Sequence, residues 1–174
     1  MKKLIILLGL SVFLLTNCDK LRNGNASNKQ TPPTNLNEQK TQAVIDKEKI
    51  EEYLDGLFLL DKAQTTSSGI YYLIEIEGEG IQPSEESTVK IKFKTSLLDG
   101  TTFESSNDFT DDGIVSFGID EQFIKGWKES ILLLKEGGKG TFIIPSGLAY
   151  GKRSSNKFPA NSVLIYEIEL IEVN

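Results

Sequence analysis

Residues 117–151 read FGIDEQFIKGWKESILLLKEGGKGTFIIPSGLAYG, and the rest of the chain is organised around this stretch. Residues 122–134 contain no proline, and their apolar side chains recur at the spacing of one helical face. Those side chains are Phe123, Trp127, Ile131 and Leu134. The glycine-rich run 136–140 is typical of a turn, and residues 141–145 are β-prone up to a proline. The stretch predicts a short helix packed on a strand, with the only tryptophan of the chain between them.

Four short motifs follow one another in this stretch: QFIKGW, LKEGG, IPS and AYG. Their order and spacing resemble those of the FKBP-type peptidyl-prolyl cis-trans isomerases, also called rotamases. The resemblance runs from about Ser68 to the C-terminus. It implies an α+β fold, in which a curved antiparallel β-sheet wraps around the short helix at Trp127, and it assigns residues 67–174 to an isomerase domain.

The N-terminus has the pattern of an export signal. Lys2 and Lys3 precede an apolar segment at 4–15, which is too short for a bilayer core that needs about 20 residues. The segment ends in LTNC, which resembles the lipobox of bacterial lipoproteins, although Asn17 departs from the usual small residue. Residues 1–18 are therefore predicted to be a lipoprotein signal peptide, with Cys18 as the lipid attachment site. Plain secretion with a free thiol is the alternative.

Residues 19–45 are polar and contain a Pro32-Pro33 pair, and we predict that they form a disordered tether. A recognition role for the proline pair is the alternative. The tether would hold the folded domain away from the membrane to which Cys18 is fixed.

Residues 46–66 are predicted to add an amphipathic helix in front of the domain, with Asp46 as its N-cap. Its apolar stripe recurs at i, i+3, i+4, i+7 and i+8 and consists of Ile50, Tyr53, Leu54, Leu57 and Phe58. We expect this stripe to pack on the chain's own domain. Dimerisation and client binding are the alternatives.

Strand patterns follow closely along residues 67–174. Residues 89–95 alternate between apolar residues and lysines, as in an antiparallel strand with one wet face. Asp99-Gly100 is a strong hairpin signal. Further strands are predicted at 70–77, 101–104, 114–117 and 163–173, with a polar loop at 107–113. In the last strand, one face carries Leu164, Tyr166, Ile168 and Leu170.

The composition excludes several kinds of chemistry. The chain has no histidine and one cysteine, so it cannot build Ser-His-Asp or Cys-His catalysis, or a histidine-containing zinc site. No phosphate-binding loop of the Walker type is present. The net charge is −6 and lysines form no block after the signal, so nucleic acid is not an expected partner. We expect no cofactor and no metal.

Prolyl isomerisation needs none of these groups, because it breaks no covalent bond. The resemblance implies that Trp127 is the pocket floor, that Ile124 offers its backbone N–H, and that Tyr150 gives its hydroxyl to a substrate carbonyl. The remaining residues implied are aromatic walls at Phe93, Phe103, Phe123 and Tyr166, a flap at Phe158, and Glu104. Without the resemblance, Phe93, Phe103 and Tyr166 could equally be plain core.

Two residues depart from the family pattern: Phe93 stands where tyrosine is frequent, and Glu104 stands where aspartate is frequent. Both departures weaken the expectation of activity. Whether Ile114 or Val115 faces the pocket stays open. The leading expectation is a membrane-anchored isomerase that assists the folding of exported proteins, binds their X-Pro segments and accepts macrolide inhibitors. The alternatives are a non-catalytic chaperone or scaffold that uses the same pocket, and a structural subunit of an envelope assembly. The oligomeric state is open.

Overall fold

The computed structural model describes residues 40–121 and 123–174, which belong to one compact unit. The predicted signal peptide, Cys18 and most of the predicted tether lie outside the described residues. Within the described part of the chain, no helix is long and apolar enough to cross a bilayer.

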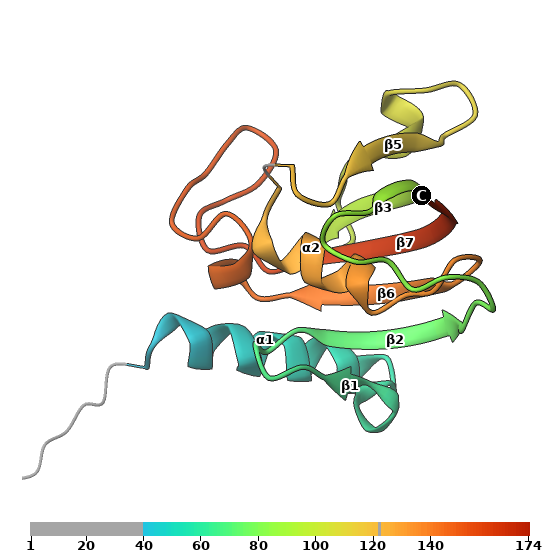
Figure 1. The fold of residues 1–174 in the computed structure, drawn as a ribbon. Coiled ribbons are helices and arrows are strands. Elements are labelled where there is room, and N and C mark those ends of the chain that lie inside the picture. The colour runs from blue at the N-terminus through green and yellow to red at the C-terminus, as the bar shows by residue number, and fades with distance from the viewer. Residues whose placement is uncertain (1–39, 122) are drawn as a thin grey trace, which may run out of the picture. The chain divides into compact units, whose positions relative to one another are not determined.

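The described residues form one antiparallel sheet with the strand order β1-β2-β6-β7-β3-β4, and β5 pairs with β3 beside this path (Figure 1). The strands are β1 Gln64–Thr65, β2 Tyr71–Ile76, β3 Thr88–Leu97, β4 Thr102–Ser105, β5 Val115–Gly118, β6 Lys139–Ile144 and β7 Leu164–Val173. The helices are α1 Gln42–Gly56 and α2 Lys125–Leu132, with 3-10 turns η1 Leu60–Lys62, η2 Ser106–Asp108 and η3 Ser146–Leu148. This arrangement confirms the predicted α+β fold.

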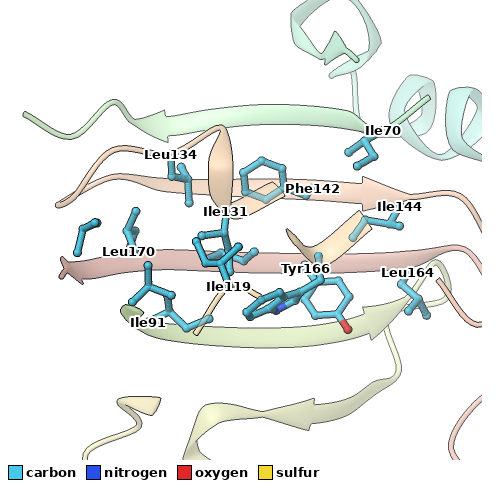
Figure 2. Close-up of a cluster of buried hydrophobic side chains, with 14 residues drawn as sticks. Ile70, Ile91, Ile119, Ile131, Leu134, Phe142, Ile144, Leu164, Tyr166 and Leu170 are labelled. Atoms are coloured by element: carbon cyan, nitrogen blue, oxygen red, sulfur yellow. The ribbon is translucent and has the colours of Figure 1, made fainter. Parts of the chain in front are cut away.

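The main core lies between α2 and one face of the sheet. The alternation predicted for the last strand is confirmed, because the four residues named for its inner face all belong to this core. Figure 2 shows Ile131 of α2 in the middle of this cluster, between the strand residues Phe142 and Tyr166. Gly126 lets the helix approach closely, since an added Cβ would lie 2.3 Å from Cγ2 of Ile144. A side chain at position 126 would therefore force Ile144 or α2 to shift.

The second core lies on the opposite face of the sheet, under α1. Ile50 and Leu54 of α1 are fully buried and cluster with the outward-facing residues Tyr71, Ile143 and Ile165. The Tyr71 hydroxyl also donates a 2.8 Å hydrogen bond to Oε1 of Glu51. The prediction that the helix packs on its own domain is therefore confirmed.

The predicted start of this helix is wrong. The helix begins at Gln42, inside the predicted tether, and Thr41 is its N-cap, accepting a 3.4 Å hydrogen bond from the Val44 N–H. Asp46 is in the second turn and only 1% exposed. An aspartate can cap a helix or serve as a buried acceptor, and here a distant residue, Ser146, uses its carboxylate.

The predicted end of the apolar stripe is also wrong. The helix ends at Gly56, so Leu57 and Phe58 do not continue its buried face. Phe58 is 87% exposed, and its backbone has a positive φ of 57°. After the helix, η1 leads into β1, which pairs with β2 and was not predicted. The segment 46–66 is therefore a helix followed by an added edge strand.

The strand predictions agree better with the structure. The prediction of one solvent-exposed face on β3 is confirmed. Lys90 forms a 2.6 Å ion pair with Glu172 of β7, and Lys94 pairs with Glu167, also of β7. The Asp99-Gly100 hairpin is confirmed too, with Gly100 at a φ of 85° between β3 and β4.

Helix α2 is shorter than the segment 122–134 over which the apolar pattern predicts it. Ile124 has extended backbone angles and is the N-cap of α2, so Phe123 precedes the helix and is 41% exposed. Leu134 follows the helix but is buried in the core. The spacing of the pattern therefore marks buried positions better than it marks helix ends.

Candidate active site

A pocket of about 450 Å³ opens where α2, β3, β5 and the loop after η3 meet. Most of the residues that the sequence predicts for a binding site are brought together here. The predicted residues in its lining are Phe93, Glu104, Phe123, Ile124, Trp127, Tyr150 and Tyr166.

Trp127 forms the base of an aromatic cluster in this pocket. The Phe123 ring lies 4.4 Å from the indole at an interplanar angle of 26°, and the Phe117 ring lies 4.5 Å from it at 54°. Trp127 itself is only 4% exposed. The three rings give this part of the pocket lining an apolar, aromatic surface.

Phe103 and Phe158 are not in the lining, which departs from their predicted roles as wall and flap. The two rings contact each other at 5.5 Å, and Phe158 stacks on Tyr150 at 4.4 Å. The stacked Tyr150 ring therefore faces the pocket in place of Phe158. Phe158 packs behind the Tyr150 ring, and Phe103 packs against Phe158 in turn.

Tyr150 carries a hydroxyl group that stays protonated. Burial raises its pKa above the usual value of 10.0, the Glu104 carboxylate raises it further, and Arg153 opposes the rise. Burial likewise raises the pKa of Tyr166, which lies 4% exposed beside it. Both groups are neutral hydrogen-bond donors at physiological pH.

Ile124 contributes a second kind of donor. Its carbonyl accepts the N–H groups of Trp127 and Lys128, at 3.2 and 3.4 Å, as the first carbonyl of α2. Among residues 40–121 and 123–174, its own N–H donates to no acceptor. The amide before α2 therefore belongs to a residue that lines the pocket, and its donor is not used by the described backbone.

The lining contains five residues that the sequence did not assign to the site, namely Phe109, Val115, Ser116, Phe117 and Glu121. Of the two residues left open, Val115 is therefore the one that lines the pocket. The other four gave little signal, because Phe109 sits in an acidic loop and Phe117 looked like an ordinary strand residue.

Phe109 reaches the pocket because its loop is tied to β3. The backbone N–H of Phe93 donates to the buried Ser106 hydroxyl at 3.1 Å, directly before the loop. The Phe109 ring then lies 6.3 Å from the Phe93 ring and remains 61% exposed. It extends the apolar wall of the pocket outward toward solvent.

The arrangement can bind and orient an apolar ring next to a carbonyl group. Within the described part of the chain, no three histidine, cysteine or acidic side chains cluster as a metal site would require. Among the polar residues in the lining, Tyr150 and Glu104 lie close enough to Tyr166 to influence its pKa.

Comparison with known proteins gives consistent matches. The family model described as "FKBP-type peptidyl-prolyl cis-trans isomerase" matches residues 79–171. The chain is 39% identical over 135 residues to a probable FKBP-type peptidyl-prolyl cis-trans isomerase FkpA of Neisseria meningitidis serogroup B, covering 77% of this chain and 48% of that protein. It is 35% identical over 123 residues to FkpA of Escherichia coli K12, covering 71% and 44%.

Solved structures agree with the fold. The crystal structure of FkpA from Escherichia coli aligns with a TM-score of 0.65 at 34% identity, covering 76% of this chain and 61% of that chain. The crystal structure of AtFKBP13 aligns with a TM-score of 0.60 at 29% identity, covering 64% and 98%. The chain spans about half the length of the curated relatives it matches. The matched motifs, the fold and these alignments establish that the chain belongs to the FKBP-type peptidyl-prolyl cis-trans isomerase family.

Proposed function

We propose that this chain catalyses cis-trans isomerisation of X-Pro peptide bonds. The observation that carries the proposal is the pocket over Trp127, which joins an aromatic floor to neutral donors at Tyr150 and Ile124. Family membership supports the same activity.

The chemistry follows from what limits peptide-bond rotation. The barrier is about 18–20 kcal/mol because rotation breaks the amide resonance. A twisted amide has less charge separation than a planar one, so an apolar, water-poor pocket favours it relative to the planar ground state. The proline ring would rest on Trp127, while the Tyr150 hydroxyl and the Ile124 N–H would hold the neighbouring carbonyl groups.

The substrates we propose are X-Pro segments of exported polypeptides, with the enzyme held at the extracytoplasmic side of a bacterial membrane by lipid on Cys18. The sequence carries this part of the proposal, through the short apolar segment that ends at the single cysteine. Stable anchoring needs more than one acyl chain, since a single chain gives only marginal binding.

The activity is tested by the refolding of a protein whose slow phase is limited by proline isomerisation. The purified chain should accelerate that phase, Trp127→Ala should abolish most of the acceleration, and rapamycin should compete. Acceleration by the wild type that survives Trp127→Ala in a folded variant would assign the activity elsewhere. No acceleration, together with suppressed aggregation of an unfolded client, would favour the non-catalytic chaperone.

The anchor is tested separately by mass spectrometry of the mature N-terminus. Wild type should carry acyl groups on Cys18, and Cys18→Ser should remain uncleaved and unacylated. An unmodified thiol at position 18 in the wild-type protein would leave the isomerase proposal intact but remove the anchor.

A further inference from the structure

Asp46 is a buried carboxylate on α1 that the proposed chemistry does not use. Its Oδ2 accepts a 2.9 Å hydrogen bond from the backbone N–H of Ser146 and a 2.6 Å bond from the Ser146 hydroxyl. Its Oδ1 accepts a 2.7 Å bond from the Gln42 side-chain amide. Both Asp46 and Ser146 are 1% exposed. Burying a carboxylate is unfavourable unless it is well hydrogen-bonded, so these bonds hold Ser146 firmly against α1.

Ser146 in turn frames the loop that carries Tyr150. Its carbonyl accepts the N–H of Ala149 at 3.0 Å and the N–H of Gly151 at 2.8 Å. These two residues flank Tyr150 directly. The N–H and hydroxyl of Ser146 therefore bond to α1, and its carbonyl bonds to the backbone on both sides of Tyr150.

The far side of the same loop is held by contacts that do not involve Ser146. The Gly151 carbonyl accepts a 2.7 Å bond from the Asn161 N–H, and the Tyr150 ring stacks on Phe158, which is itself half-buried. These contacts leave the near end of the loop, where it leaves β6, dependent on Ser146 and so on Asp46.

We infer that Asp46 is a positioning residue for Tyr150 and that α1 is part of the catalytic unit. The helix lies outside the residues matched by the family model, 79–171, yet it fixes where the Tyr150 hydroxyl meets a substrate. The inference rests on the proposed function, in which that hydroxyl binds a substrate carbonyl.

The test is a double-mutant cycle on kcat/KM in the full chain, with Asp46→Ala, Tyr150→Phe and the double variant. Each single change should lower kcat/KM about two- to tenfold, as expected for one hydrogen bond. The double variant should be no slower than the slower single variant, because Asp46 acts through Tyr150. Losses that multiply in the double variant would overturn the inference, and so would an Asp46→Ala variant with wild-type kcat/KM.

Two further variants separate positioning from general stability. Asp46→Asn should restore kcat/KM to near the wild-type value, since its amide oxygen can still accept from Ser146 while Gln42 turns its amide. Tyr71→Phe removes another bond between α1 and the sheet, the one to Glu51, without contacting Ser146. It should leave kcat/KM unchanged. A loss in Tyr71→Phe equal to that in Asp46→Ala would assign the effect to undocking of α1 and overturn the inference.

A readout without substrate keeps this inference distinct from the proposed function. When the chain is labelled with 3-fluorotyrosine, the fluorine NMR resonance of Tyr150 is identified by its loss in Tyr150→Phe. Asp46→Ala should shift that resonance and Tyr71→Phe should not. A shift in a chain without isomerase activity would reject the proposed function but keep the positioning role, whereas an unmoved resonance would overturn the positioning role. If Asp46→Ala does not fold, Ser146→Ala removes only the hydroxyl bond and should show the same changes at smaller size.

Discussion

The Tyr150 and Phe158 rings stack almost in parallel, with centroids 4.4 Å apart and planes inclined by 15°. Tyr150 lines the pocket and Phe158 does not. The tyrosine therefore has two separable parts: a ring that packs on Phe158 and a hydroxyl group that is available to a ligand. A phenylalanine at position 150 would keep the first part and lose the second.

Tyr150→Phe should lower kcat/KM about two- to tenfold, because it removes one hydrogen bond of about 0.5–1.5 kcal/mol. Its free energy of unfolding should change by less than about 0.5 kcal/mol, since the stack on Phe158 is retained. Proline-limited refolding and denaturant unfolding measure the two quantities on the same preparation. An unchanged kcat/KM would show that the hydroxyl does not contact the substrate.

The rate should be independent of pH from about pH 6 to 9. The pKa of Tyr150 is raised above 10.0 by burial and by Glu104, so its hydroxyl keeps its proton throughout this range. The donor is lost only when the pH rises above 10, and the rate should fall there. Tyr150→Phe should lack this part of the alkaline fall. A bell-shaped profile with an apparent pKa between about 6 and 9 would instead indicate a titrating acid or base in the mechanism.

The strands of this domain could be predicted well because their signals are local. Lysines and apolar residues alternate along β3, and the Asp99-Gly100 pair sets the turn after it. Asp46 could not be read in the same way. Its side chain looks like a helix cap in the sequence, and only the fold brings it to Ser146, 100 residues away. Phe109 was missed for a similar reason, since the Ser106 tie that places it is a tertiary contact.

Phe109→Ala should lower kcat/KM up to about tenfold for peptides with a bulky apolar residue beside the proline. The ring is 61% exposed next to Phe93, so its apolar area becomes buried only when a ligand binds. Peptides with alanine or glycine at that position should be affected less, and stability should change little. Ile81→Ala is the matched control, because Ile81 is 65% exposed but does not line the pocket. Equal losses for all peptides would show that Phe109 does not select the neighbouring residue.

Tyr71→Phe should lower the free energy of unfolding at pH 7 by about 0.5–1.5 kcal/mol, because the hydrogen bond from Tyr71 to Glu51 joins β2 to α1. Burial, and then Glu51, raises the pKa of Tyr71 from 10.0 to about 12. Between these two values the unfolded chain releases the phenol proton while the folded chain retains it. The contribution of the Tyr71 hydroxyl to the free energy of unfolding is therefore fully present below pH 10 and is lost as the pH rises toward 12.

The variant lacks this group, so its stability should decline less steeply above pH 10, and the gap between the two proteins should narrow. Denaturant unfolding followed by Trp127 fluorescence at pH 7 and at several values above pH 10 measures the gap. Absorbance of tyrosinate locates the pKa directly, as the difference between wild type and Tyr71→Phe. A phenol that titrates near pH 10 in that difference, with a gap that does not narrow, would show that the Tyr71–Glu51 bond does not hold α1 on the sheet in solution.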